Sequence, residues 1–270
     1  MEYQTNYLAV NKESWNQRTK VHVQSDFYAV EAFKQGKNSL NEIELQLLPD
    51  LTGKKVLHLQ CHFGQDSIAL ARMGAVVTGV DLSDEAIKEA KLLAEACGEN
   101  VSFICCDVYD LPNHLTDTFD FIFTSYGVIG WLPDTDKWAN IVAHYLKEKG
   151  ELLFVEFHPV VWMFDQSFSK IQYSYFNVET IEETDEKTYA ENPTEKSTDS
   201  AFKSVTWNHS ISEVVTSLLE HNMQLIALKE YDYSPYNCFD QTEEYEQGKF
   251  RIQHLQNKIP MVYAIKAIKK

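Results

Sequence analysis

Strand-like and helix-like segments alternate along the middle of this chain. Apolar runs with the length and composition of buried strands are separated by segments in which apolar residues recur at helical spacing. Alternation of this kind favours a parallel sheet with helices on both faces, because a parallel strand pair needs a long crossover between its members. The expected strands are 56–60, 76–81, 101–106, 119–125 and 151–157, and the expected helices are 65–73, 84–97 and 135–147.

The segments on either side of this alternation differ from it. Residues 1–52 have helical patterns at 11–34 and 39–48, and we expect them to form a helical segment that covers the cofactor site. Residues 160–208 are aromatic and acidic, with a strand-like piece at 172–177 and an acidic tract at 179–199, and we predict an insertion that acts as a substrate lid.

The alternating pattern returns after the insertion. We expect a helix at 210–221 and strands at 224–233 and 261–268, so that 53–159 and 209–270 together form the core. The last strand follows a loop of about 25 residues, which would let it insert antiparallel beside the fifth strand. The predicted fold is therefore α/β, a three-layer doubly wound, mostly parallel seven-stranded sheet with a reversed last strand, an inserted α+β or β lobe, and N-terminal helices.

Composition limits the classes of partner. The 270 residues, 44% of them hydrophobic, are enough for one globular unit. A formal net charge of -16 opposes binding to nucleic acid and to anionic membranes. The chain has no apolar run of the roughly 18 residues that a membrane span needs, and its five cysteines, an odd number, indicate reduced thiols. We expect a cytoplasmic protein of undetermined oligomeric state.

Two neighbouring strand ends predict a nucleotide-cofactor site. The first strand runs into a turn that ends at Gly64, and the second ends at Asp81. An acidic residue in that place can accept hydrogen bonds from a ribose diol, while the preceding turn holds the rest of the nucleoside. The pattern thus indicates an adenosine-type ligand across the first two strands.

These residues resemble the class I S-adenosylmethionine-dependent methyltransferases, closely over 54–126 and more loosely to 269. The family's first turn usually reads Asp-x-Gly-x-Gly-x-Gly, and the matching residues here are His58, Gln60, His62 and Gly64, so that only the last glycine is kept. The resemblance implies a seven-stranded fold, S-adenosylmethionine as cofactor with S-adenosylhomocysteine as product, and a small-molecule methyl acceptor. Gln60 and His62 must then adopt backbone shapes that glycine would allow more easily.

The resemblance also assigns cofactor contacts. Asp81 matches the ribose-binding acid, Leu82 and Ser83 its neighbours at the adenine, and Asp107 the acceptor of the adenine amino group. From the N-terminal segment, Trp15 and Arg18 are placed to close over the cofactor. The remaining predicted contacts are Cys61, Cys106, Val108 and Ser125, beside the four turn residues named above.

Methyl transfer from a sulfonium is a direct SN2 displacement, which alignment and exclusion of water can accelerate without a dedicated base. Where an acceptor must lose a proton, a residue at the carboxyl end of the fourth or fifth strand would be in range. The candidates are His158, Glu156 and Tyr126. His58, Cys61 and His62 lie close together, but they lack the paired spacing of zinc ligands, so we predict no metal site.

Two alternatives to an enzyme that methylates a small molecule stay open at this point. The chain could be a catalytically silent module that binds the cofactor or a partner protein. It could also be an NAD(P)-dependent oxidoreductase, although the Gly-x-Gly-x-x-Gly spacing of that class is missing.

Overall fold

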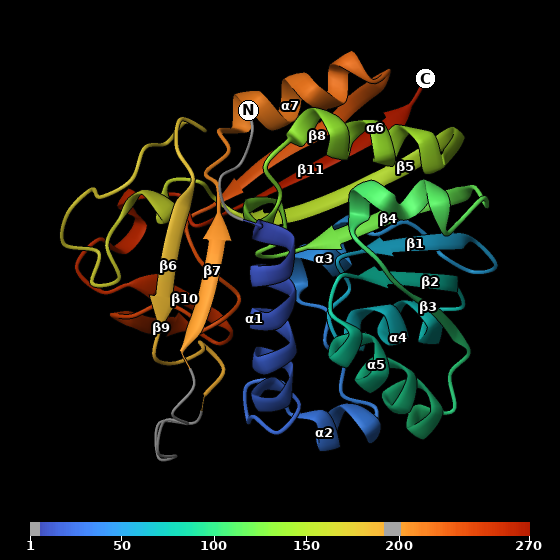
Figure 1. Cartoon of the computed structure of the whole chain (residues 1–270), viewed down its shortest axis with the longest axis horizontal. Helices are drawn as coiled ribbons and strands as arrows, with labels where there is room; N and C mark the ends of the chain where they lie inside the picture. The colour runs from blue at the N-terminus through green and yellow to red at the C-terminus, as the bar shows by residue number, and fades with distance from the viewer. Residues whose placement is uncertain (1–5, 192–200) are drawn as a thin grey trace.

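A single seven-stranded sheet forms the centre of the structure, a computed structural model that describes residues 6–191 and 201–270 (Figure 1). The strand order is β3-β2-β1-β4-β5-β11-β8. The pairs among β1 to β5 are parallel, and β11 runs antiparallel to both β5 and β8, which confirms the reversed last strand. The strands are β1 (Lys55–Leu59), β2 (Val76–Asp81), β3 (Val101–Cys105), β4 (Phe119–Ser125), β5 (Leu146–Phe157), β8 (Met223–Tyr231) and β11 (Val262–Lys269).

Helices cover both faces of the sheet and bury two separate apolar cores. Strand side chains alternate between them, so that Val56 belongs to one core and its neighbour Leu57 to the other. The first core includes side chains of α3 (Glu42–Leu47), α4 (Gln65–Arg72) and α5 (Asp84–Cys97), and the second includes those of α6 (Thr135–Tyr145) and α7 (Ile211–Glu220). This arrangement is the predicted three-layer architecture.

Helix α5 illustrates how local sequence sets an element's bounds. The Ser83 hydroxyl accepts a hydrogen bond of 3.0 Å from the backbone N–H of Ala86, which satisfies one of the unpaired donors at the helix start. Gly98 ends the helix with a left-handed φ of 70°, a conformation that favours glycine. The helix bounds predicted from these two residues agree with the structure.

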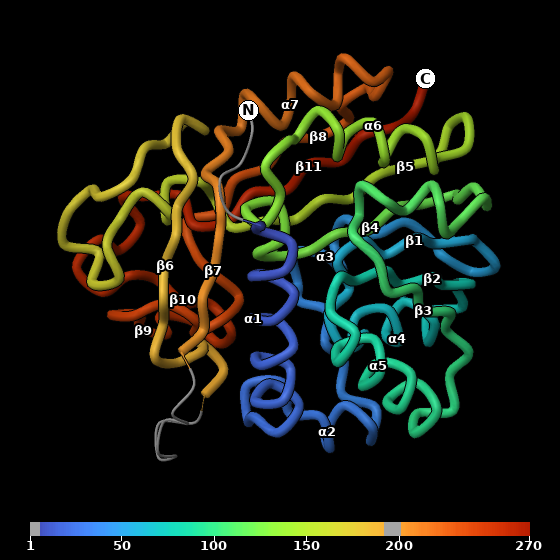
Figure 2. Tube along the Cα trace, viewed as in Figure 1, coloured from blue at the N-terminus to red at the C-terminus, as the bar shows by residue number. Residues whose placement is uncertain are grey.

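The remaining elements lie outside the sheet. Figure 2 shows α1 running between the sheet and the hairpin formed by β6 and β7. The Asn11 side chain joins α1 to this hairpin, donating to the carbonyl of Val205 at 2.8 Å and accepting from its N–H at 2.9 Å. These elements are α1 (Tyr7–His22), α2 (Val30–Lys34), β6 (Ile181–Asp185), β7 (Phe202–Thr206), β9 (Thr242–Glu246), β10 (Lys249–Ile252) and the 3₁₀ turns η1 (Val108–Asn113), η2 (Ile129–Trp131), η3 (Val161–Met163) and η4 (Gln256–Lys258).

The predicted strand at 172–177 is wrong. No strand within the described part of the chain pairs with that segment. Instead the N–H of Gln172 donates to the carbonyl of Met163, and Asn208 donates its side-chain amide to the carbonyl of Ser174. Its aromatic residues therefore lie in the lobe without entering a sheet, and Phe176 is 60% exposed. The strands of the lobe are β6 and β7, and residues 192–199 of the predicted acidic tract lie outside the described part of the chain.

The region expected to be a loop before the last strand also contains a hairpin. Strands β9 and β10 pair antiparallel there, and their connection includes Gly248 at a φ of 70°. The residues of β9 are mostly exposed and polar, so their sequence lacks the apolar alternation that would have predicted a strand.

Candidate functional site

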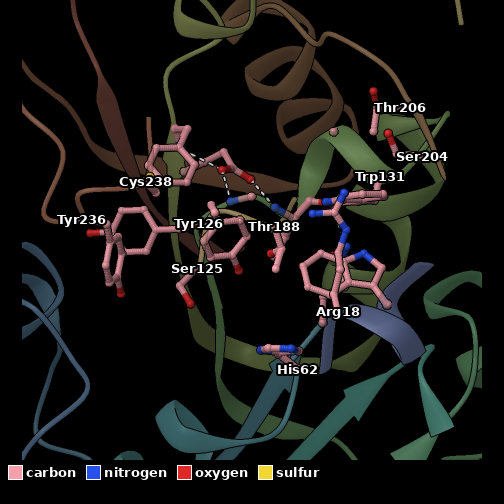
Figure 3. A pocket seen from close by; sticks show the side chains of 18 of the residues that line it. Arg18, His62, Ser125, Tyr126, Trp131, Thr188, Ser204, Thr206, Tyr236 and Cys238 are labelled. Carbon is pink, nitrogen blue, oxygen red and sulfur yellow. Dashed lines mark hydrogen bonds between the residues drawn. The ribbon is translucent and has the colours of Figure 1, made fainter. Parts of the chain in front are cut away.

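A cavity of about 1510 Å³ lies where the carboxyl ends of β1 to β5 meet the N-terminal helix and the lobe. Ligands of open α/β sheets bind at this edge. In Figure 3, His62 lies at the cavity floor, Ser125, Tyr126 and Tyr236 face the cavity from one side, and Arg18 and Trp131 face it from the other. The lining residues divide the cavity into two ends. One lies at the ends of β2 and β3, and the other lies at the ends of β4 and β5.

The turn after β1 keeps the backbone of a glycine-rich turn without its glycines. Gln60, His62 and Gly64 all have left-handed φ angles, of 55°, 50° and 79°. Left-handed backbone costs about 1–2 kcal/mol for a residue with a side chain. This conformational cost therefore falls on Gln60 and His62, the two positions of the turn with left-handed φ angles where the sequence lacks the family's glycines.

The side chains of this turn are partly committed to the protein. The Gln60 amide donates to the carbonyl of Val128 at 2.8 Å, while its buried Oε1 has no partner within the described residues. The buried Nε2 of His62 likewise has none there, and burial lowers the pKa of His62 to about 3, so that its ring is neutral. Both residues line the cavity and present unpaired polar atoms that a ligand could satisfy.

Gly64 is required by close packing as well as by its backbone. A Cβ atom at this position would lie 2.8 Å from the Phe103 ring and 3.0 Å from Ala90. Cys61 and His58 lie beneath the turn, where His58 Nδ1 is 2.8 Å from the Ser67 hydroxyl and burial lowers the pKa of His58 to about 3. These two buried side chains border the cavity but are occupied with packing the turn onto α4.

Asp81 ends β2 and lines the cavity. Its Oδ2 accepts the N–H of His62 at 2.8 Å, and its Oδ1 accepts the N–H of Ser83 at 2.8 Å. An ionised carboxylate has about four acceptor sites, so one on each oxygen is left for a ligand such as a ribose diol. Burial raises the pKa of Asp81 to about 6, although the backbone donors oppose that shift.

The wall beside Asp81 is built from the ends of β2 and β3. Leu82, Cys106, Asp107 and Val108 all line the cavity, and Asp107 Oδ1 accepts the N–H of Tyr109 at 3.2 Å. Ser83 is not among the lining residues. Its hydroxyl donates to Asn16 Oδ1 at 2.6 Å and caps α5, so it ties α1 to the sheet.

The end of β4 carries two hydroxyl groups toward carboxylates, of which Asp66 is partly buried and Glu44 fully buried. Ser125 donates to Asp66 Oδ2 at 3.2 Å, and the Tyr126 phenol donates to Glu44 Oε2 at 3.1 Å. Glu44 is fully buried, and burial together with nearby Asp66 raises its pKa to about 7. Tyr126 also lines the cavity next to Tyr236, with ring centroids 5.1 Å apart.

The other two predicted proton acceptors are engaged elsewhere. Glu156 accepts four backbone N–H groups, those of Gly127, Val128, Ile129 and Phe157, and thereby holds the loop after β4. His158 does not line the cavity. It accepts the N–H of Val160 at Nδ1, and its Nε2 lies 2.9 Å from Glu230, with its pKa lowered by burial.

Trp15 and Arg18 border the cavity from α1. Trp15 meets the rings of His62 and Trp131 edge to face, at centroid distances of 5.2 and 5.1 Å. The Arg18 guanidinium pairs with Asp185 at 2.9 Å, which leaves several of its N–H donors unused. The predicted N-terminal contribution thus lies at the cavity, joined there to the lobe.

The structure adds residues that sequence patterns did not indicate. One of them, Asp66, lies just after the turn. Its position could have been recognised from the sequence, because it is a carboxylate at the start of a helix next to a ligand-binding turn. Glu44 and Tyr236 come from segments far from β4 in the chain, and only folding brings them beside Tyr126. Trp131 closely follows β4, and folding brings its ring against Trp15 of α1. No strand-end position or motif marks them in the sequence.

Within residues 6–191 and 201–270, no helix is both long and apolar enough to cross a bilayer. Within the same residues, no three His, Cys, Asp or Glu side chains gather as a metal ion would require.

Sequence comparison matches the first part of the core. Residues 56–150 match a family model described as a methyltransferase domain. The chain is 31% identical over 121 residues to the ubiquinone biosynthesis O-methyltransferase of Idiomarina loihiensis. This match covers 43% of this chain and 49% of that protein. It is 37% identical over 115 residues to the enzyme of the same name from Coxiella burnetii, and this match covers 43% of this chain and 47% of that enzyme. The chain thus spans about half the length of the curated relatives it matches.

Solved structures match over most of the chain. An S-adenosylmethionine-dependent methyltransferase from Clostridium acetobutylicum is 14% identical and covers 94% of this chain and 98% of its own, with a TM-score of 0.60. The geranyl diphosphate C-methyltransferase of Streptomyces coelicolor, solved with Mg²⁺, geranyl diphosphate and S-adenosyl-L-homocysteine, is 13% identical and covers 99% of both chains, with a TM-score of 0.59. These findings confirm the predicted fold class and the predicted resemblance.

Proposed function

Because residues 56–150 match a methyltransferase domain and lie in the fold of S-adenosylmethionine-dependent methyltransferases, we propose that this protein transfers a methyl group from S-adenosylmethionine to a small molecule. One observation carries the proposal. The turn with three left-handed residues and the carboxylate of Asp81 meet at the floor of one cavity, joined by the hydrogen bond from the His62 N–H.

The residues present fit the cofactor. Asp81 keeps one acceptor site on each oxygen for the ribose hydroxyls, and Asp107 can accept from the adenine amino group between the apolar side chains of Leu82 and Val108. At the amino-acid end, the unpaired Oε1 of Gln60 can accept from the cofactor's ammonium group. When bound, the cofactor supplies a methyl group on an electrophilic sulfonium.

The protein's own contribution is alignment and exclusion of water. Trp15 and Arg18 from α1, and Asp185 from the lobe, close the side of the cavity opposite the β4 end. We propose that residues 1–52 and 160–208 serve as the cover over the cofactor and the acceptor. Holding the two reactants in line inside such an enclosure accounts for much of the acceleration of a displacement reaction.

Tyr126 is the proposed residue nearest to the reacting atoms. Among the three predicted proton acceptors it alone both lines the cavity and keeps a hydroxyl directed at a buried carboxylate, Glu44. Glu156 is saturated by backbone donors and positions the loop that follows Tyr126. His158 lies behind the cavity wall.

A small-molecule acceptor is supported by the relatives, which are named as O-methyltransferases of ubiquinone biosynthesis. The cavity is large enough for the cofactor and a second compound together. The five cysteines are free, in agreement with the proposed cytoplasmic location.

Calorimetric titration with S-adenosylhomocysteine tests the cofactor, with NADH as the matched comparison. We expect heat of binding and a rise in melting temperature with the first ligand and neither with the second. A response to NADH alone would favour the oxidoreductase alternative. Binding of S-adenosylmethionine without turnover over a broad panel of acceptors would favour the catalytically silent module.

A further inference from the structure

The β4 end of the cavity forms a chamber with aromatic walls and one acidic side. Its lining includes Asp66, Tyr126, Phe157, Tyr236 and Phe239, which we call the acceptor chamber. The rings are in mutual contact: centroids are 5.1 Å apart for Tyr126 and Tyr236, 5.5 Å for Tyr126 and Phe157, and 5.1 Å for Phe157 and Phe239. The chamber is next to the cofactor turn, because Asp66 lies two residues after Gly64.

Negative charge in this chamber is not balanced by the protein. Asp66 accepts the Ser125 hydroxyl, and Glu44 behind it accepts Tyr126, but neither carboxylate forms a salt bridge within residues 6–191 and 201–270. Burial raises the pKa of both groups. Buried carboxylates without a cation are costly, and a cationic ligand would relieve that cost.

The whole cavity has the same bias. Among the residues of 6–191 and 201–270, nine carboxylate side chains line it against three cationic ones, Arg18, Lys37 and Lys187, and Arg18 is already paired with Asp185. An acceptor with phosphate or carboxylate groups would meet repulsion in the chamber. A cation would meet Asp66 and tyrosine rings, a type of side chain whose face attracts positive charge.

We propose that the methyl acceptor is a primary or secondary amine, held in the acceptor chamber as an ammonium ion against Asp66, Tyr126 and Tyr236. This inference rests on the proposed function and names its substrate class. It selects nitrogen rather than the hydroxyl oxygen that the names of the relatives would suggest.

The reaction balances with groups on the protein. The ammonium passes one proton to the Asp66 carboxylate, which frees a lone pair on nitrogen. That pair forms the new N–C bond as the C–S bond breaks, and the sulfonium keeps the electrons of that bond and becomes a neutral thioether. The proton later leaves Asp66 for solvent with the products.

The cofactor's own ammonium is the other possible source of positive charge beside Asp66. The unpaired Oε1 of Gln60 offers that group a separate acceptor at the turn. The two sources differ in what they predict for a variant of Asp66, so one experiment separates them.

The experiment measures ligand binding to the full chain by calorimetry. In the presence of saturating S-adenosylhomocysteine, 2-phenylethylamine is compared with its uncharged counterpart 2-phenylethanol. We expect the amine to bind at least ten-fold more tightly. Asp66→Asn should remove most of that preference and leave the affinity for the alcohol within two-fold, and Tyr236→Leu should also weaken the amine more than the alcohol.

Asp165→Asn is the matched control, because Asp165 lines the same cavity and is likewise partly buried, but its carboxylate is already bound by Ser167, Ser169 and backbone N–H groups. It should leave the preference unchanged. Equal affinities for amine and alcohol in the wild-type protein would overturn the proposal.

Titration of Asp66→Asn with S-adenosylhomocysteine and with methylthioadenosine, which lacks the amino-acid end, supplies the second arm. Weaker binding of the first alone, with the amine preference intact, would assign Asp66 to the cofactor and overturn the acceptor proposal. A wild-type protein that binds no S-adenosylhomocysteine would contradict the proposed function itself, before any amine is added.

Discussion

Asp81→Asn is the most informative single substitution, because Asp81 carries the proposed ribose contact and also holds the turn. The variant removes the charge and replaces one oxygen by an NH₂ group. Each oxygen of the wild-type carboxylate accepts one backbone N–H at 2.8 Å. One of these two donors, from His62 or Ser83, would therefore face another donor in the variant.

The expected loss of affinity follows from the hydrogen bonds that remain. Two ribose hydroxyls donate to the ionised carboxylate, and a hydrogen bond to a charged group contributes about 1.5–3 kcal/mol. The variant keeps one uncharged acceptor, so we expect binding of S-adenosylhomocysteine to weaken by about 1.5–3 kcal/mol, roughly 10- to 150-fold in Kd. The unpaired backbone donor should lower the free energy of unfolding by about 1–3 kcal/mol as well.

The pH dependence provides an independent check on the same group. The pKa of Asp81 is raised by burial to about 6 in the free protein, and the ribose contact favours its ionised form. The affinity of the wild-type protein should therefore fall as the pH is lowered through 6, to about one tenth of its plateau value at pH 5. Asp81→Asn has no group to titrate and should lack this dependence.

Calorimetry with S-adenosylhomocysteine between pH 5 and 8 measures both effects, and chemical denaturation shows whether the variant is folded. Asp84→Asn is a matched control, since Asp84 lies three residues further on, pairs with Lys12 on the surface and does not line the cavity. We expect its Kd to stay within two-fold of the wild type. A folded Asp81→Asn protein with unchanged Kd, or a wild-type affinity that is flat across pH 6, would refute the ribose assignment.

Three further predictions concern the groups around the cavity. Gln60→Gly should be more stable to denaturant than Gln60→Ala by about 1 kcal/mol. Both variants lose the side-chain amide, but only alanine keeps the strain of a side chain at a left-handed φ. Equal stabilities of the two variants would contradict the φ of 55° at this position. Glu156→Gln should lower the free energy of unfolding by about 2–4 kcal/mol, because the new NH₂ group faces two backbone N–H donors. The control Glu148→Gln, at an exposed position, should change the free energy of unfolding by less than about 0.5 kcal/mol. A loss for Glu156→Gln no larger than that of the control would argue that the four backbone hydrogen bonds to Glu156 contribute little. The pKa of Glu44 is raised from 4.5 to about 7, so the stability that comes from its protonated form is complete below pH 4.5 and is lost as the pH rises through 7. The free energy of unfolding of Glu44→Gln should therefore exceed that of the wild type by up to about 3 kcal/mol at pH 8 and should equal it at pH 4.5. A difference in urea unfolding that does not depend on pH would count against the raised pKa.

The elements that the sequence predicts well are those in which local chemistry and burial act together. The alternation of apolar runs predicted all five parallel strands and the helices between them, since the inner strands β1, β4 and β5 are largely buried on both faces and each helix on one. The boundaries of α5 follow from one capping hydroxyl and one glycine. The lobe was harder to predict, because its aromatic residues pack without forming regular strands.

The candidate site divides in the same way. Asp81, Asp107 and the turn residues sit at strand ends, so their place in the chain already predicts that they share one edge of the sheet. His158 and Glu156 occupy equivalent positions, but a strand end does not fix where a side chain points or which backbone groups it binds.

The sheet, its helical layers and the row of residues along its carboxyl edge can all be read from the amino-acid sequence, because they depend on the spacing of apolar residues and on short-range turns. Folding alone places Glu44, from a short helix before the first strand, and Tyr236, from the connection between β8 and β11, beside Tyr126. The side-chain contacts that join them span 82 and 110 residues of chain. No local pattern encodes such a meeting, since it arises from how the packed layers and the lobe fit together.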